Sequence, residues 1–130
     1  MAGRRYLVDT NIFVEILLQQ TKEADCINFV TSNFHDIAIS QYSIHSIALI
    51  CYRKKNITLF TTFVNDIIDN IEVITLNNAA LKDIENIILQ YRLDYDDAYQ
   101  LKAAQLNNFE LVTMDQDFSK VSSIQKILFI

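Results

Sequence analysis

The sequence predicts an α/β fold in which helices cover both faces of a short parallel β-sheet, giving three layers. Short apolar segments alternate along the chain with longer segments whose apolar residues recur at helical spacing. Strands separated by helices are joined by crossovers, which favour parallel pairing. The 130 residues, of which 51% are hydrophobic, suit a single domain over residues 1–130 with a core that needs no disulfide or metal to fold.

The first half of the chain contains two predicted strands and three predicted helices. Residues 6–8 are an apolar run that ends at Asp9, as expected for a buried strand. A short helix over residues 12–18 follows, and then a helix over residues 22–33 with Ala24, Ile27 and Val30 at helical spacing. The next strand is residues 36–39, and the helix over residues 40–54 ends in cations, which favour a helix C-terminus.

The second half repeats this alternation. A helix over residues 59–70 precedes a strand over residues 71–76, and residues 78–91 form an amphipathic helix. Asp94 is placed to cap the helix over residues 95–106, with Asp97 in its first turn. The last two predicted strands are residues 109–113 and residues 127–130.

Composition limits the possible partners and the compartment. The net charge of −5 means that the surface as a whole does not attract nucleic acid, so a polyanion must be drawn by a local patch or a bound cation. Cys26 and Cys51 match no metal-ligand spacing and are expected to be buried free thiols. No signal peptide or membrane-spanning segment is expected, which predicts a cytoplasmic protein without a membrane partner.

Aspartates stand at the predicted carboxyl ends of the first and fourth strands. Asp9 ends the first strand, Asp115 and Asp117 follow the fourth, and Asp97 opens the helix between. Open parallel sheets bind ligands beyond the carboxyl ends of their strands, so these carboxylates converge if the two strands are neighbours. Clustered carboxylates need a counter-charge, and Mg²⁺ or Mn²⁺ suits oxygen ligands. Such a centre can activate water and offset the charge of a phosphodiester.

Each aspartate also has a purely structural explanation. Asp97 could complement the helix dipole, and Asp115 and Asp117 could be turn or cap residues. Asp9 is harder to explain in this way, because a buried carboxylate without partners is costly. Glu15 is expected on the solvated face of the first helix.

Three segments resemble PIN domains, the metal-dependent nucleases that include VapC-type toxins. The segments are YLVDTNIF at residues 6–13, DDAYQLKAAQL at residues 96–106 and LVTMDQDF at residues 111–118. The resemblance implies strand order 3-2-1-4-5. It further implies that the catalytic metal ligands are Asp9, Asp97 and Asp115, with Asp117 at the edge of the site or binding through water.

The same resemblance implies a ribonuclease that uses one or two Mg²⁺ or Mn²⁺ ions and metal-activated water. Asn11 and Thr113 match polar positions that orient such a centre. Family relatives suggest an RNA substrate, a cognate antitoxin if the protein is a toxin, and a homodimer, for which the helices over residues 22–33 and 59–70 offer apolar surface.

One part of the family pattern is missing. PIN domains normally carry a glutamate in the helix after the second strand, whereas ISQYSIHSIALICYR, residues 39–53, has no acid and places Ser46 there. A hydroxyl is a neutral, weak ligand, so the alternative function is a PIN-fold protein that binds RNA or a partner with little or no cleavage. Basic residues cluster at residues 4–5 and 53–55, but no aromatic residues alternate with them, and the sequence gives no base-reading signal.

Overall fold

The computed structural model describes residues 3–130, and five parallel strands form one sheet in the predicted order β3-β2-β1-β4-β5. The strands are β1 Tyr6–Val8, β2 Ile37–Ser40, β3 Glu72–Ile74, β4 Glu110–Thr113 and β5 Ile127–Phe129. The helices are α1 Thr10–Leu17, α2 Glu23–Ser32, α3 Gln41–Arg53, α4 Ile57–Asp66, α5 Asn78–Tyr91 and α6 Tyr95–Asn107. Three short 3₁₀ helices complete the fold: η1 Phe34–Asp36, η2 Ile68–Asn70 and η3 Gln116–Val121.

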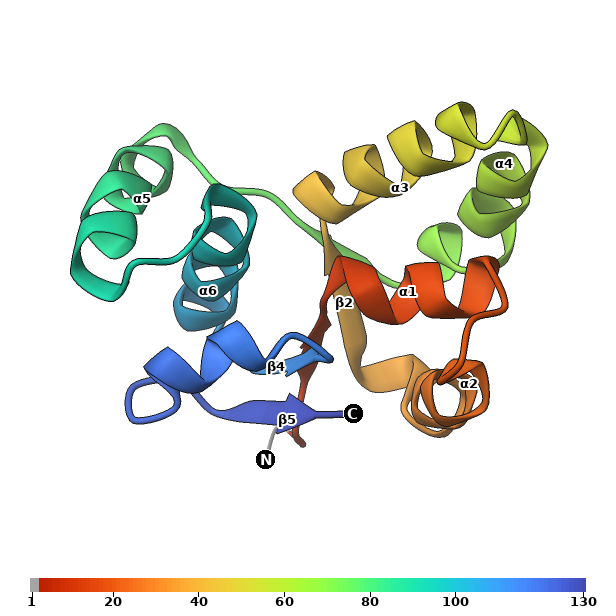
Figure 1. Cartoon of the computed structure of the whole chain (residues 1–130). Coiled ribbons are helices and arrows are strands. Elements are labelled where there is room, and N and C mark those ends of the chain that lie inside the picture. Colours follow the sequence, from red (N-terminus) through yellow and green to blue (C-terminus); the bar gives the residue numbers. More distant parts are fainter. Residues whose placement is uncertain (1–2) are drawn as a thin grey trace.

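The helices divide between the two faces of the sheet, which confirms the three-layer α/β/α architecture. Helices α5 and α6 cover one face, and α1 to α4 cover the other (Figure 1). Alternation along the central strand assigns its side chains: Leu7 lies in the core beneath α5 and α6, and Val8 lies in the core beneath α1 to α4. Asp9 has the parity of Leu7, so the alternation directs its carboxylate toward α6.

The pairing of β1 with β4 determines where the strand ends lie. Leu7 is opposite Leu111 and Val8 is opposite Val112, and the amide of Asp9 donates to the Val112 carbonyl at 2.8 Å. Strand β1 therefore stops beside β4, and the residues that follow the two strands are neighbours. The two outer strands, β3 and β5, have three residues each and are paired on one side only.

Capping side chains account for the observed starts of α1 and α4, which differ from the predicted ones. Helix α1 begins two residues before its predicted start because the Asp9 side chain accepts from the Thr10 amide. Helix α4 begins at Ile57 because Asn56 caps it, and its C-terminal part is the separate turn η2 instead of continuous helix. Strand β3 is shorter than predicted, as suits an edge strand.

The expectation that Glu15 lies on a solvated face is wrong. Its side chain is buried, and it accepts a hydrogen bond from the Lys22 amide at 2.7 Å, which holds the turn between α1 and α2. A local donor explains why this carboxylate is tolerated in the interior. Cys26 and Cys51 are buried free thiols, as predicted. Within residues 3–130, the structure contains no helix with the length and apolar character needed to cross a membrane.

Candidate functional site

Asp9 is a buried carboxylate held by three hydrogen bonds from three different elements. It is 6% exposed, follows β1 directly and caps α1. Its Oδ1 accepts from the Thr10 amide at 2.8 Å and from Gln100 Nε2 at 3.0 Å, and its Oδ2 accepts from Thr113 Oγ1 at 2.8 Å. These donors offset the cost of burying the charge and fix the orientation of the carboxylate.

Gln100 of α6 connects Asp9 to helix α3. Its Nε2 also donates to Ser43 Oγ at 2.7 Å, and Thr10 Oγ1 donates to the same Ser43 oxygen at 2.8 Å. An ionised carboxylate only accepts, so the amide must turn its NH₂ group toward Asp9. Gln100 Oε1 is consequently left buried without a hydrogen-bond partner among the described residues.

Sequence reasoning missed both Gln100 and Ser43. The available signal was the spacing of Gln100 three residues after Asp97, which places the two side chains on one face of α6. Ser46, the predicted substitute for the family's glutamate, is half-buried one turn further along α3. The network passes through Ser43, and no side-chain hydrogen bond joins Ser46 to another described residue.

Thr113 links Asp9 to the segment that follows β4. Besides donating to Asp9, its Oγ1 accepts from the Asp115 amide at 2.9 Å and lies 3.4 Å from Asn11 Nδ2. Asn11 Oδ1 in turn accepts from the Met114 amide at 3.3 Å. The predicted supporting residues Asn11 and Thr113 thus join the start of α1 to the end of β4.

Asp97, Asp115 and Asp117 form a close carboxylate group. Each offers one oxygen, and these oxygens lie within 4.8 Å of one another. Asp115 also caps η3 by accepting from the Asp117 amide at 2.9 Å. It is therefore a cap residue, as its structural explanation predicts, and also a member of the close carboxylate group. We call Asp9, Asp97, Asp115 and Asp117 the acidic centre; Asp9 stands beside the close group and connects to it through Thr113.

The start of α6 adds further negative charge. Asp94, Asp96 and Asp97 form a second group with oxygens within 4.8 Å, of which only Asp97 is buried. Helix α6 begins at Tyr95 as predicted, but the Asp94 side chain makes no capping hydrogen bond. The carboxylate of Asp94 is exposed, and it accepts no hydrogen bond from the first turn of α6.

Burial and mutual repulsion perturb the acidic centre. Burial raises the pKa of Asp97 to about 8, with further contributions from the charges of Asp96, Asp115 and Asp9 and from a hydrogen bond with Asp115. The pKa of Asp9 is also raised, chiefly by burial, although hydrogen bonds from Gln100, Thr113 and Thr10 oppose the shift. A carboxyl group with a pKa of about 8, as at Asp97, is not balanced by a nearby positive charge.

The donor set fits a hard divalent cation. Every candidate ligand is a carboxylate oxygen, the chemistry preferred by Mg²⁺ and Mn²⁺, and a cation would relieve the repulsion that adds to burial in raising the pKa of Asp97. Asp97, Asp115 and Asp117 could hold such an ion directly, with Asp9 on its inner side. With such a cation bound, the acidic centre would present positive charge to an anionic ligand.

The raised pKa of Asp97 predicts a pH-dependent loss of stability in metal-free protein. Between the ordinary value of 3.8 and about 8, the folded form keeps the proton that the unfolded form has lost. The free energy of unfolding should therefore fall as pH rises, by at most about 1.4 kcal/mol per pH unit from this group. Asp97→Asn should remove this component. In urea unfolding with a chelator present, the free energy of unfolding of the variant should therefore rise relative to that of wild type from pH 5 to pH 8. Parallel curves would contradict the assignment, and Asp66→Asn, at an exposed position, is the matched control.

The position of Gln100 predicts a loss of stability when its amide is removed. Gln100→Leu removes one of the three donors to the buried Asp9 carboxylate and one donor to Ser43, and should lower the free energy of unfolding by about 1–3 kcal/mol at neutral pH. Denaturant titration measures this, with Gln105→Leu as an exposed control on the same helix. Equal losses in the two variants would show that the hydrogen bonds of Gln100 contribute little.

Comparison with known proteins agrees with this geometry. The model of the PIN domain family matches residues 6–124. No curated protein sequence matches the chain. Similar solved structures include a toxin–antitoxin complex from Klebsiella pneumoniae, 18% identical with a TM-score of 0.74 and 95% of each chain covered. Another is the sarcin-ricin loop cleaving toxin VapC20 of Mycobacterium tuberculosis, 10% identical with a TM-score of 0.78, covering 92% of this chain and 95% of the toxin.

DNA-bound VapBC from Salmonella typhimurium is similar over 98% of both chains, with 16% identity and a TM-score of 0.74. At these identities the structural likeness shows the fold, whereas the family model matches the sequence itself. That match spans β1 to η3 and includes every residue of the acidic centre. The chain belongs to the PIN domain family.

Proposed function

We propose that this protein is a divalent-metal-dependent endoribonuclease that hydrolyses phosphodiester bonds with metal-activated water. The observation that carries the proposal is the close group of Asp97, Asp115 and Asp117 beside the buried Asp9, at the carboxyl ends of adjacent strands. Membership of the PIN family and the placement of these residues in the matched segment support it. Asp9, Asp97 and Asp115 are the proposed catalytic residues, and Asp117 completes the metal ligands.

A bound Mg²⁺ or Mn²⁺ would lower the pKa of water and offset charge on the phosphodiester. The chain's own contribution is positioning. Gln100 and Thr113 hold the Asp9 carboxylate in one orientation, and Asn11 and Thr113 fix the segment that carries Asp115. Because Asp9 and Asp97 are buried, the inner side of the site excludes bulk water, which strengthens electrostatic interactions there.

We propose RNA as the substrate and a cognate antitoxin as a protein partner in the cytoplasm. VapC20 is described as a toxin that cleaves the sarcin-ricin loop, and the similar structures from Klebsiella pneumoniae and Salmonella typhimurium are a toxin–antitoxin complex and a VapBC complex. These relatives suggest the toxin role for this chain. A homodimer is also proposed, since several large apolar side chains remain exposed on its helices.

The proposal predicts RNA cleavage that requires Mg²⁺ or Mn²⁺ and the acidic centre. Asp9→Asn, Asp97→Asn and Asp115→Asn should each lower the cleavage rate at least about 100-fold, since each weakens the hold on the cation. Gel analysis of an RNA panel measures the rate, and circular dichroism checks folding. Asp66→Asn makes the same charge change at an exposed position and should cleave at the wild-type rate. Folded wild type that leaves the whole panel intact with Mn²⁺ present would overturn the proposal.

The second candidate is a PIN-fold protein that binds RNA or a partner with weakened or absent cleavage. The absence of an acid from α3, whose residues are QYSIHSIALICYR, favours it. Fewer charged ligands lower affinity for a hard cation, so the site could hold metal weakly.

Restoring the acid separates the two candidates. Ser46→Glu should bind Mg²⁺ or Mn²⁺ more tightly than wild type in calorimetric titration, because it adds a carboxylate to the site. Ser46→Gln, which adds similar bulk without charge, is the control. Tight binding by wild type favours the nuclease, whereas binding and cleavage that emerge only in Ser46→Glu favour the second candidate. No gain in affinity would show that residue 46 does not face the metal.

A further inference from the structure

Negative charge is absent from one continuous part of this acidic chain. Residues 37–65, which form β2, α3 and nearly all of α4, contain three basic residues and no Asp or Glu. The rest of the chain contains the other eight Lys and Arg and all 16 acidic residues. The three cations are consecutive, Arg53, Lys54 and Lys55, and we call them the cationic end of α3.

The charges of the cationic end are available to a ligand. All three side chains are exposed, and none forms an ion pair with another residue of the described chain. The other basic cluster differs, because Arg5 is paired with Glu72 at 2.7 Å and lies over the ring of Phe109. Of the two clusters, only the cationic end of α3 therefore has all of its charges unpaired.

Backbone hydrogen bonds hold the cationic end in an ordered turn. The amide of Lys54 donates to the Ile50 carbonyl at 3.0 Å. The amide of Lys55 donates to the Tyr52 carbonyl at 2.9 Å, and Lys55 has a φ of 58°, the left-handed conformation that often ends a helix. Asn56 then caps α4. Tyr52, which is 71% exposed, stands at the start of this turn beside the cations.

Stabilisation of a helix C-terminus does not account for this cluster. Cations in the last turn offset the helix dipole, but the other α-helices of residues 3–130 have no basic residue in their last turn. The fold does not depend on such compensation elsewhere. Lys54 and Lys55 also lie beyond the last residue of α3, and the acid-free segment continues into α4. The charge pattern therefore indicates an anionic ligand.

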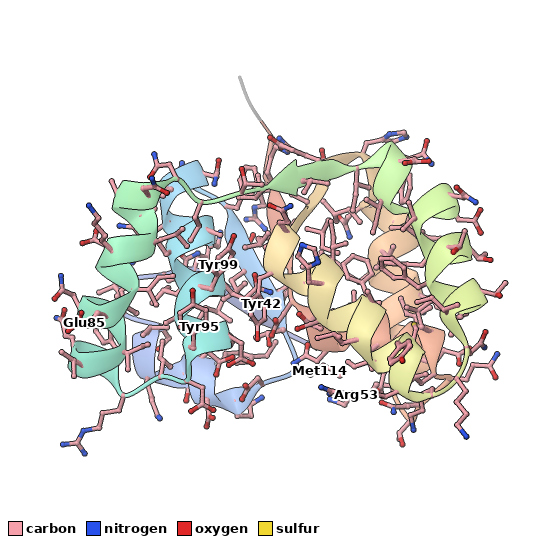
Figure 2. All side chains as sticks on the ribbon, turned by 90° about the horizontal axis from the view of Figure 1, so that it is seen from above. Tyr42, Arg53, Glu85, Tyr95, Tyr99 and Met114 are labelled. Atoms are coloured by element: carbon pink, nitrogen blue, oxygen red, sulfur yellow. The ribbon has the colours of Figure 1, made fainter. Side chains whose placement is uncertain are left out.

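Helix α3 runs from the acidic centre to the cationic end. Ser43, in its first turn, belongs to the hydrogen-bond network of Asp9. Arg53 follows ten residues later, which is ~15 Å along the helix axis. Figure 2 shows α3 crossing the upper face of the molecule, with Arg53 and Met114, the residue before Asp115, toward the same edge of the view.

Charge and length together favour a nucleic-acid strand as the ligand. Lys and Arg bind phosphate oxygens without reading sequence, which agrees with the absence of a base-reading signal. One stacked strand, rising about 3.4 Å per nucleotide, covers the ~15 Å in about four to five nucleotides. The exposed ring of Tyr52 adds a stacking surface beside the phosphate contacts, a combination typical of single-strand binding that an acidic peptide would not use.

We propose that the cationic end of α3 binds the phosphate backbone of single-stranded RNA about four to five nucleotides from the scissile phosphate. This inference rests on the proposed function, since it takes RNA as the substrate and the acidic centre as the place of cleavage. It also explains how a protein with a net charge of −5 holds a polyanion, because the contacts lie on its one acid-free segment.

The salt dependence of binding tests the inference. Arg53→Gln, Lys54→Gln and Lys55→Gln are combined in an Asp97→Asn background, which prevents cleavage, and titrated with labelled oligouridine of about ten nucleotides in Mg²⁺. Affinity should fall at least about tenfold. The slope of log binding constant against log salt concentration should become shallower by about 2, at about 0.7 per lost phosphate contact.

Two controls accompany this titration. Arg4→Gln, Lys82→Gln and Lys126→Gln, combined in the same background, remove the same residue types at exposed positions outside the acid-free segment and should leave the slope unchanged. Lys54→Arg with Lys55→Arg keeps both charges and should bind like the background protein. Circular dichroism checks that every variant folds.

Substrate length provides the second measurement. With Asp97 intact, the triple variant at residues 53–55 should cleave the long oligonucleotide with KM raised at least about fivefold and with little change in kcat, because the cations lie ~15 Å from the acidic centre. A dinucleotide cannot reach both places, so wild type and variant should cleave it at the same rate. Equal impairment on both substrates would show a structural effect and overturn the inference.

The outcomes separate this inference from the proposed function. If RNA is cleaved but the triple variant keeps the affinity, salt slope and KM of the unsubstituted protein, the backbone site is wrong and the nuclease stands. If no RNA is cleaved but the triple variant loses affinity and slope, the backbone site stands and the nuclease fails. A polyglutamate peptide is the remaining probe. Its loss by the triple variant, with RNA affinity unchanged, would assign this face to an acidic protein and overturn the inference.

Discussion

The burial of one carboxylate where two parallel strands end side by side is the constraint on which the site depends. Asp9 follows β1 directly, and the pairing of β1 with β4 leaves it no bulk solvent on the inner side. A charge in that position requires donors, and these come from the start of α1, the middle of α6 and the end of β4. The same contacts that make Asp9 tolerable also tie together the three elements that carry the rest of the acidic centre.

Charge at this edge opposes the stability of the fold. The hydrogen bonds to Asp9 lower the pKa of its carboxyl, but burial outweighs them, and Asp97 has fewer compensations and a pKa raised to about 8. The protein keeps this unfavourable arrangement although neutral residues would fold more easily, which is typical of functional sites. A cation would turn the repulsion into attraction, so the demands of folding and of binding metal meet at the same four side chains.

Periodicity and family resemblance were sufficient to predict the layers, the strand order and the acidic residues, because those features depend on local patterns and on motifs of fixed spacing. What the sequence did not predict depends on long-range contacts. Gln100 meets partners 91 and 57 positions away; its spacing three residues after Asp97 indicates a shared helix face but not which residues that face meets. Glu15 looked solvated because its donor, the Lys22 amide, belongs to a turn whose course is set by packing.

The two outer strands have a consequence for how other chains can associate with this protein. With three residues each, β3 and β5 expose very little unpaired main chain, so an extended peptide could form few hydrogen bonds with either strand. Recruitment by sheet extension is therefore disfavoured, as is runaway edge-to-edge polymerisation. Specific association must therefore rely on the side chains of the helices. Their shape and charge, instead of backbone hydrogen bonds, would select the binding partner.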